Sequence, residues 1–82
     1  MQKILVIEDD QALSQLICKR LKDYGYHAIE IDSFYHAIEE FSNLLPDLVL
    51  LDINLPYEDG YVLCKKIRAI SNVPILMISA RT

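Results

Sequence analysis

The sequence contains few glycine, proline and cysteine residues, which are abundant in low-complexity, disordered and disulfide-rich chains. Two Gly and three Pro in 82 residues are too few for a low-complexity or disordered segment. The only cysteines, Cys18 and Cys64, are isolated and lack the spacing of a disulfide framework, a zinc site or a redox motif. We interpret both as reduced, partly buried small side chains with no chemical role.

Positive charge is also scarce. Eight Lys and Arg against twelve Asp and Glu give a net charge of −4, which is the opposite of the basic surface that nucleic-acid-binding domains present. No apolar run approaches the roughly 18 residues needed to span a bilayer, and the first residues lack a signal-peptide pattern. We therefore expect a cytoplasmic segment that contacts neither DNA nor a membrane directly.

Hydrophobic residues, by contrast, make up 52% of the chain, and their spacing alternates between two periods. Short apolar runs predict strands at 4–7, 27–31, 47–51 and 74–78. Between them, apolar residues recur at helical intervals. Asp10 is the expected N-cap of the first helix and Gly25 its C-terminal stop, Ser33 the cap of the second, and Pro46 its end.

Each predicted helix has an apolar face that we expect to point into the core. In the first helix this face is Leu13, Leu16, Ile17 and Leu21. In the second it is Phe34, Ala37, Ile38, Phe41 and Leu45. In the third, which begins near Gly60, it is Leu63, Cys64 and Ile67. We interpret Pro56 as stiffening the loop before this third helix and Gly60 as freeing the backbone where the helix begins.

The order βαβαβαβ predicts an α/β fold with a doubly wound parallel sheet and helices on both faces. We find no repeat, linker or composition shift that would divide the chain, so residues 1–82 form one domain. Because domains most often have about 100–150 residues, we expect this one to be incomplete. In such sheets the functional site lies beyond the carboxyl ends of the central strands.

Carboxylates stand at two of those strand ends. Glu8 and Asp9 follow the first predicted strand and Asp52 follows the third. If these strands are neighbours, three carboxylates converge, and a hard divalent cation such as Mg²⁺ would relieve their repulsion. Acidic side chains at the start of a helix also interact favourably with the helix macrodipole, and that simpler explanation suffices for Asp10.

These residues carry a family resemblance. The run Ile4-Leu5-Val6-Ile7-Glu8-Asp9-Asp10, then Leu50-Leu51-Asp52-Ile53-Asn54-Leu55-Pro56 with Asp59-Gly60, then Ile78-Ser79-Ala80, resembles the response-regulator receiver domains of two-component signalling systems. The match covers the whole chain in the right order. It implies a flavodoxin-like fold with strand order 2-1-3-4-5, a topology known for a receiver protein.

The resemblance also implies roles for individual residues. Asp52 would be the nucleophile that takes a phosphoryl group from the phosphohistidine of a sensor histidine kinase. Glu8, Asp9, the Asp52 carboxylate and the backbone carbonyl of Asn54 would hold Mg²⁺. Ser79 would be the hydroxyl that contacts the phosphoryl group. The chain would be a signalling domain that accepts phosphate and not an enzyme acting on other molecules.

The chain departs from the family at its end. Receivers continue with a helix, a fifth strand bearing a Lys and a switch aromatic, and a final helix, so we expect an incomplete receiver here. We also expect a homodimer, or other self-association, through the apolar edge strand near residues 75–78. The segment Ile78-Ser79-Ala80-Arg81-Thr82 resembles the winged-helix transcription-factor branch, which implies a DNA-binding output domain in the parent protein.

Other functions stay open or are disfavoured. A phosphorylation-incompetent fragment that self-associates through its uncovered edge remains an alternative. A flavin or nucleotide binder is disfavoured because acids stand where a Gly-rich phosphate loop would be. A phosphatase with paired aspartates is disfavoured because Asn54 occupies the second place. His27 and His36 are expected at the surface, away from the strand ends. The tyrosines are interpreted as packing or rim residues: Tyr24, Tyr26, Tyr35, Tyr57 and Tyr61.

Overall fold

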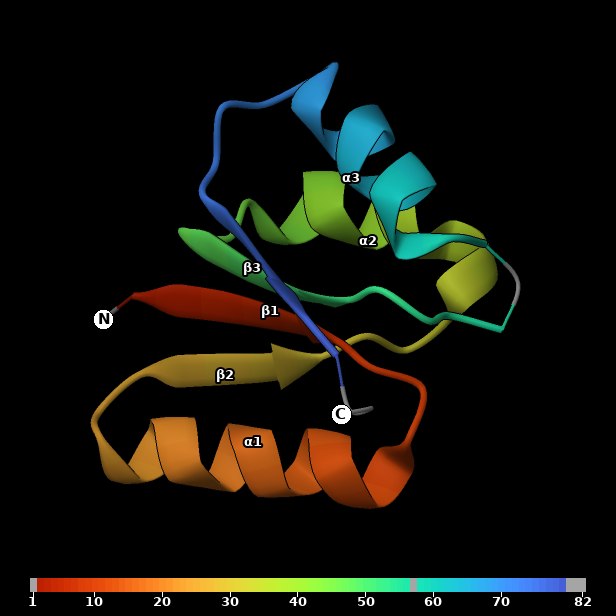
Figure 1. Cartoon of the computed structure of the whole chain (residues 1–82). Coiled ribbons are helices and arrows are strands. Elements are labelled where there is room, and N and C mark those ends of the chain that lie inside the picture. The colour runs from red at the N-terminus through yellow and green to blue at the C-terminus, as the bar shows by residue number, and fades with distance from the viewer. Residues whose placement is uncertain (1, 57, 80–82) are drawn as a thin grey trace.

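A computed structural model describes residues 2–56 and 58–79, in which a four-stranded sheet lies between layers of helices (Figure 1). The elements in chain order are β1 (Lys3–Ile7), α1 (Gln11–Asp23), β2 (His27–Glu30), the 3-10 turn η1 (Phe34–His36), α2 (Ala37–Leu44), β3 (Leu48–Asp52), α3 (Gly60–Arg68) and β4 (Ile75–Ile78). Each expected strand and helix is present, with strand ends within a residue of their predicted places.

The sheet has the order β2-β1-β3-β4, and every pairing in it is parallel. Helix α1 covers one face, while α2 and α3 cover the other (Figure 1). The predicted doubly wound α/β fold is therefore confirmed. Because β1 and β3 are neighbours with Ile7 opposite Leu51, the residues that follow them meet at one edge of the sheet.

Two apolar clusters hold the layers together, since successive strand residues point to opposite faces. Leu5, Ile7 and Leu51 belong to the cluster under α2 and α3, where Phe41 and Ile67 are also buried. The cluster under α1 contains the alternate strand residues and parts of the helix, namely Ile4, Val6, Cys18, Ala28 and Leu50. Burial on both faces explains why β1 and β3 have continuous apolar sequences.

Helix α1 begins and ends as expected. The Asp10 carboxylate accepts a hydrogen bond from the Leu13 N–H at 3.1 Å and so caps the first turn. At the other end Gly25 has φ +91°, and its N–H donates to the Lys22 carbonyl while Tyr26 N–H donates to the Leu21 carbonyl. This is the Schellman arrangement, which requires a left-handed residue at the position of Gly25.

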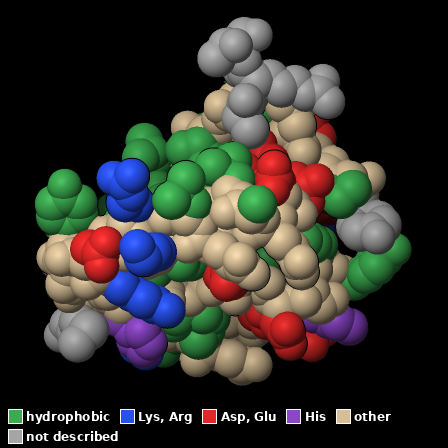
Figure 2. All heavy atoms as spheres, turned by 90° about the horizontal axis from the view of Figure 1, so that it is seen from below, with side chains coloured by type: hydrophobic (Ala, Val, Ile, Leu, Met, Phe, Trp, Pro, Cys, Tyr) green, Lys and Arg blue, Asp and Glu red, His purple; other side chains and the backbone are tan. Residues whose placement is uncertain are grey.

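The inward face predicted for α1 is partly wrong. Ile17 and Leu21 pack against the core, but the buried residues of the helix are Ser14 and Cys18, and Leu16 is 50% exposed. At about 100° per residue, position 16 lies roughly 200° from positions 14 and 18 and so faces away from the sheet. In the view from the α1 side, hydrophobic side chains remain visible at the surface beside Lys and Arg side chains (Figure 2).

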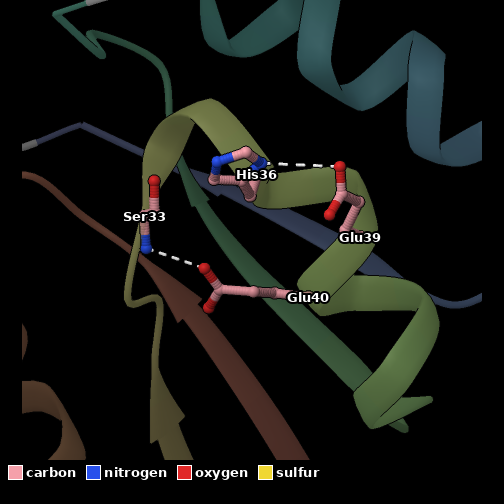
Figure 3. Close-up of polar contacts among 4 residues, drawn as sticks. All are labelled: Ser33, His36, Glu39 and Glu40. Carbon is pink, nitrogen blue, oxygen red and sulfur yellow. Dashed lines mark hydrogen bonds and ion pairs between the residues drawn. The ribbon is translucent and has the colours of Figure 1, made fainter.

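The second helix differs from the prediction at both ends. The Ser33 side chain makes no capping hydrogen bond. Instead the Glu40 carboxylate accepts from the N–H of Asp32 at 2.8 Å and from the N–H of Ser33 at 2.7 Å, and Figure 3 shows the bond to Ser33. Leu45, predicted to face inward, is the helix C-cap with φ 49° and is 73% exposed. Leu44 packs against the core in its place, because the chain turns left-handed before Pro46.

The remaining expectations concern exposure. Cys18 is buried and Cys64 half-buried, both as free thiols, and His27 and His36 are exposed, which confirms the expected burial of the cysteines and the surface position of the histidines. The tyrosines at positions 24, 26, 35 and 61 are also exposed, so they lie at the rim of the molecule and not in its core. Tyr57 lies outside the described part of the chain. Among the helices that the structure describes, none combines the length and apolar character needed to cross a membrane.

Candidate functional site

Three carboxylates meet where β1 and β3 end. Glu8 follows β1 directly and Asp52 is the last residue of β3, so the parallel register places them side by side. One carboxylate oxygen each from Glu8, Asp9 and Asp52 lies within 4.8 Å of the others. Glu8 and Asp52 are only 4% and 3% exposed, whereas Asp9 is exposed at the mouth of the site. The convergence expected from the sequence is present.

The hydrogen bonds between described residues in this cluster leave a buried oxygen of Glu8 without a partner. Oδ1 of Asp52 accepts from the backbone N–H of Asn54 at 3.1 Å, and Oε2 of Glu8 accepts a long bond of 3.4 Å from the Asp10 N–H. Oε1 of Glu8 is buried and has no hydrogen-bond partner among the described residues. A buried carboxylate oxygen in this position is costly unless a proton or a cation satisfies it.

The electrostatics of Glu8 reflect this situation. Burial raises the pKa of its carboxyl from 4.5 to about 7, and the adjacent Asp52 carboxyl adds to the rise. The Asp10 N–H acts in the opposite direction, because it stabilises the charged form. Near neutral pH the site therefore holds or releases a proton readily, and a bound cation would replace that proton.

The loop between β3 and α3 forms the wall of the site. Gly60 N–H donates to the Ile53 carbonyl at 2.9 Å, and Asn54 and Asp59 form an isolated antiparallel bridge. A Cβ on Gly60 would lie 2.3 Å from the Asp52 carbonyl oxygen, so only glycine fits. Our interpretation that Gly60 frees the backbone was thus wrong in its reason, because close approach and not a left-handed conformation requires it.

Sequence reasoning missed the cap of α3. The Asp59 carboxylate accepts from the Tyr61 N–H at 2.7 Å and so satisfies one of the free donors at the helix start. The signal was available, because an Asp directly before a helical pattern is a favoured N-cap. The same loop lines a hollow of about 590 Å³ with Asp9, Ile53, Asn54, Leu55, Pro56, Glu58 and Asp59.

Ser79 lies at the same edge of the sheet. It follows Ile78, the residue of β4 that pairs with Asp52. Its side chain is exposed, which suits a residue that would contact a ligand entering from solvent. The rest of the Ser-Ala motif, from residue 80 to residue 82, lies outside the described residues.

The donor set suits a hard divalent cation. Glu8, Asp9 and Asp52 offer only carboxylate oxygens, and Mg²⁺ prefers oxygen ligands while keeping several of its waters. The specific observation in favour of a cation is Oε1 of Glu8, because it is a buried acceptor to which no residue in the described part of the chain donates. The residues present therefore fit a magnesium ion.

Comparison with known proteins agrees with the resemblance seen in the sequence. The family model described as the response regulator receiver domain matches residues 4–82. A transcriptional regulatory protein of Bacillus subtilis, YvcP, is 48% identical over 82 residues, which are 100% of this chain and 35% of the relative. The chain thus spans about a third of the length of the curated relatives it matches.

Solved structures agree with the sequence matches. The N-terminal domain of the nisin resistance regulator NsrR superposes with a TM-score of 0.92 at 32% identity, over 100% of this chain and 69% of that one. The response regulator TrrA of Thermotoga maritima, solved in complex with Mg(2+)-BeF, superposes with a TM-score of 0.90 at 28% identity, over 100% of this chain and 72% of that one. The four strands and three helices therefore correspond to most of each of those domains.

Proposed function

The chain belongs to the response regulator receiver family, and we propose that it accepts a phosphoryl group on Asp52 from the phosphohistidine of a sensor histidine kinase. The observation that carries the proposal is the cluster of the buried Glu8 and Asp52 with the exposed Asp9, in which Oε1 of Glu8 has no partner among the described residues. The cluster combines a shielded nucleophile with a site for a cation, which are the two requirements of phosphoryl transfer to a carboxylate.

In the proposed reaction, an oxygen of Asp52 attacks the phosphorus of phosphohistidine. A P–O bond forms as the P–N bond breaks, giving an acyl phosphate, and the released histidine nitrogen takes up a proton. The Asn54 N–H occupies Oδ1 of Asp52 and fixes the carboxylate plane, so Oδ2 is the oxygen we assign to the attack. The depth of Asp52, only 3% exposed, keeps bulk water away from the acyl phosphate.

The side chains of Glu8, Asp9 and Asp52 and the backbone carbonyl of Asn54 would hold Mg²⁺. When bound, this cation supplies the positive charge that offsets the phosphoryl oxygens. The Ser79 hydroxyl, at the same sheet edge, would donate a hydrogen bond to the phosphoryl group. We propose no turnover of a separate substrate: the domain is a signalling module that is itself modified.

The relatives extend the proposal to the parent protein. YvcP is named as a transcriptional regulatory protein, and we propose that residues 1–82 are part of the receiver of a cytoplasmic regulator whose winged-helix output domain binds DNA. With a net charge of −4, this segment itself would not contact nucleic acid or membrane. A homodimer through the β4 edge, where Leu76 is 56% exposed, completes the proposal; a monomeric mass by light scattering at micromolar concentration would contradict it.

The experiment that tests phosphoryl acceptance is intact-mass spectrometry after incubation with acetyl phosphate and MgCl₂. The parent chain should gain one phosphoryl group, and Asp52→Asn should gain none. Asp10→Asn is the matched control, because it removes the same charge two residues from Glu8 while Asn still caps α1. Absence of the adduct on a chain that is folded by circular dichroism would contradict the proposal.

A further inference from the structure

The loop from β3 to α3 is fixed at its base but held at its tip by one polar contact between described residues. The base is closed by the Gly60–Ile53 hydrogen bond and the Asn54–Asp59 bridge. Beyond them, Oε2 of Glu58 accepts from the Lys66 ammonium on α3 at 2.5 Å. The pair joins residues eight apart in the sequence, so it ties loop to helix and is no ordinary one-turn helix pair.

Glu58 stands between two hollows. On one side is the acidic hollow of the candidate site, which it lines together with Asp9 and Asn54. On the other is a smaller hollow of about 230 Å³ between η1, α2 and α3, which it lines together with Lys66. His36 and Glu39, drawn in Figure 3, line the smaller hollow from the α2 side. Glu58 thus borders both hollows, one beside the candidate site and one beside α3.

We propose that Lys66 is a positioning residue: it holds the Glu58 carboxylate on the α3 side of the loop and keeps it from joining the cation site. The inference rests on the proposed function, because it takes Mg²⁺ to bind among Glu8, Asp9 and Asp52. A released Glu58 would bring its negative charge closer to Asp9, which lines the same hollow and is one of the three clustered carboxylates. Cation binding would strengthen, and the approach of an anionic phosphoryl donor would weaken.

The test compares Mg²⁺ affinity in Lys66→Met and Lys65→Met by NMR titration of backbone amides with MgCl₂. Both variants remove one positive charge from the exposed side of α3, but among the ion pairs of the described residues only Lys66 contacts Glu58. Lys66→Met should bind Mg²⁺ roughly two- to fivefold more tightly than Lys65→Met, the range expected for a partly exposed pair. Adding Glu58→Gln to Lys66→Met should return the affinity to that of Lys65→Met.

Kinetics supply a second readout. The concentration of acetyl phosphate at half-maximal rate should rise in Lys66→Met, while the maximal rate at saturating donor and MgCl₂ stays that of Lys65→Met. Simple loss of folding would instead lower the maximal rate and weaken Mg²⁺ binding.

Two results would overturn the inference: equal Mg²⁺ affinities in the two variants, or weaker binding in Lys66→Met. Neither result touches the proposed function, because the parent chain would still bind the cation. If the parent itself fails to bind Mg²⁺ while folded, the proposed function is contradicted and the inference with it.

Discussion

Glu8 and Glu40 are two carboxylates that lie close to the ends of strands, yet the fold treats them differently. Glu40, on α2, accepts hydrogen bonds from two backbone N–H groups after β2, at 2.8 Å from Asp32 and at 2.7 Å from Ser33, the second of which Figure 3 shows. Glu8, after β1, is almost fully buried and leaves Oε1 without a partner among the described residues. The Glu40 carboxylate is thus hydrogen-bonded to the backbone, whereas Oε1 of Glu8 is available to a ligand.

The difference follows from where each chain segment turns. After β2 the chain enters a 3-10 turn at the edge of the sheet, where free N–H groups need an acceptor and Glu40 supplies it. After β1 the chain leaves from the middle of the sheet beside β3, so Glu8 meets the Asp52 carboxylate, and among the described residues only the Asp10 N–H donates to it, through a long bond of 3.4 Å. A carboxylate is therefore structural or functional according to the donors around it, and its residue type alone does not decide.

The largest effect should come from removing the Glu8 carboxylate, and it should appear in Mg²⁺ affinity. Glu8→Gln should lower the affinity for Mg²⁺ by at least about tenfold, because even hydrogen-bonded neighbours of metal ligands contribute about 10- to 100-fold. Without metal, the same variant should unfold at a higher urea concentration above pH 7, since its amide donates to Asp52 where Glu8 only repels it. NMR titration and urea denaturation measure the two effects. Unchanged Mg²⁺ affinity would place the cation elsewhere.

The second prediction concerns pH. The folded-state pKa of Glu8 is raised from 4.5 to about 7, so the folded chain binds this proton more tightly than the unfolded chain does. The contribution of Glu8 to stability is then fully present below about pH 4.5 and is lost as the pH rises towards 7. In EDTA, the stability difference between parent and Glu8→Gln should grow across this window, as measured by urea midpoints at several pH values. MgCl₂ should reverse it, and a constant difference would contradict the assignment.

Removing the Glu40 carboxylate should lower stability and leave Mg²⁺ binding unchanged. Glu40→Ala should destabilise the chain by about 1.5–3 kcal/mol, because it leaves two N–H groups without their charged acceptor. Glu39→Ala is the matched control: its side chain is 77% exposed and contacts only the exposed His36 ring among the ion pairs of the described residues, so we expect a change within about 0.5 kcal/mol. Urea denaturation distinguishes them, and neither variant should alter Mg²⁺ affinity. A similar loss in both would remove the contrast.

The smallest effect is expected at the end of α2. Leu45 has φ 49°, a strained backbone conformation for a non-glycine residue, and its side chain is 73% exposed and so packs little against the rest of the chain. Leu45→Gly should be neutral or stabilise the chain by up to about 1 kcal/mol, because glycine adopts this conformation without a Cβ clash. Thermal unfolding measures the change. A clear loss of stability would show that the exposed side chain packs more than its accessibility indicates.

Much of the fold could be predicted from local patterns. The continuous apolar runs located β1 and β3, because a strand buried on both faces has no polar side to alternate with. Asp10 and Gly25 marked the ends of α1, since capping depends on residues within one turn of the helix. The carboxylates at the ends of two such strands then predicted the acidic site once the strands were taken as neighbours.

Other features could not be read locally. Leu16 is as apolar as Leu21, but only the packing of Ser14 and Cys18 against the sheet shows which side of α1 is inside. The need for glycine at position 60 depends on the carbonyl of Asp52, eight residues earlier in the chain. In each case the deciding neighbour is distant in sequence and acts through space.

The sequence by itself therefore determined the order of the elements, the two ends of α1 and the residues that end the central strands, because these depend on side-chain period and on contacts within a turn. Only the tertiary structure decided that Oε1 of Glu8 lacks a partner among the described residues while the Glu40 carboxylate has two, and that Glu58 is held by Lys66. The physical reason is that hydrogen bonding and charge depend on which donors, carboxylates and ammonium groups the folded chain brings within a few ångströms.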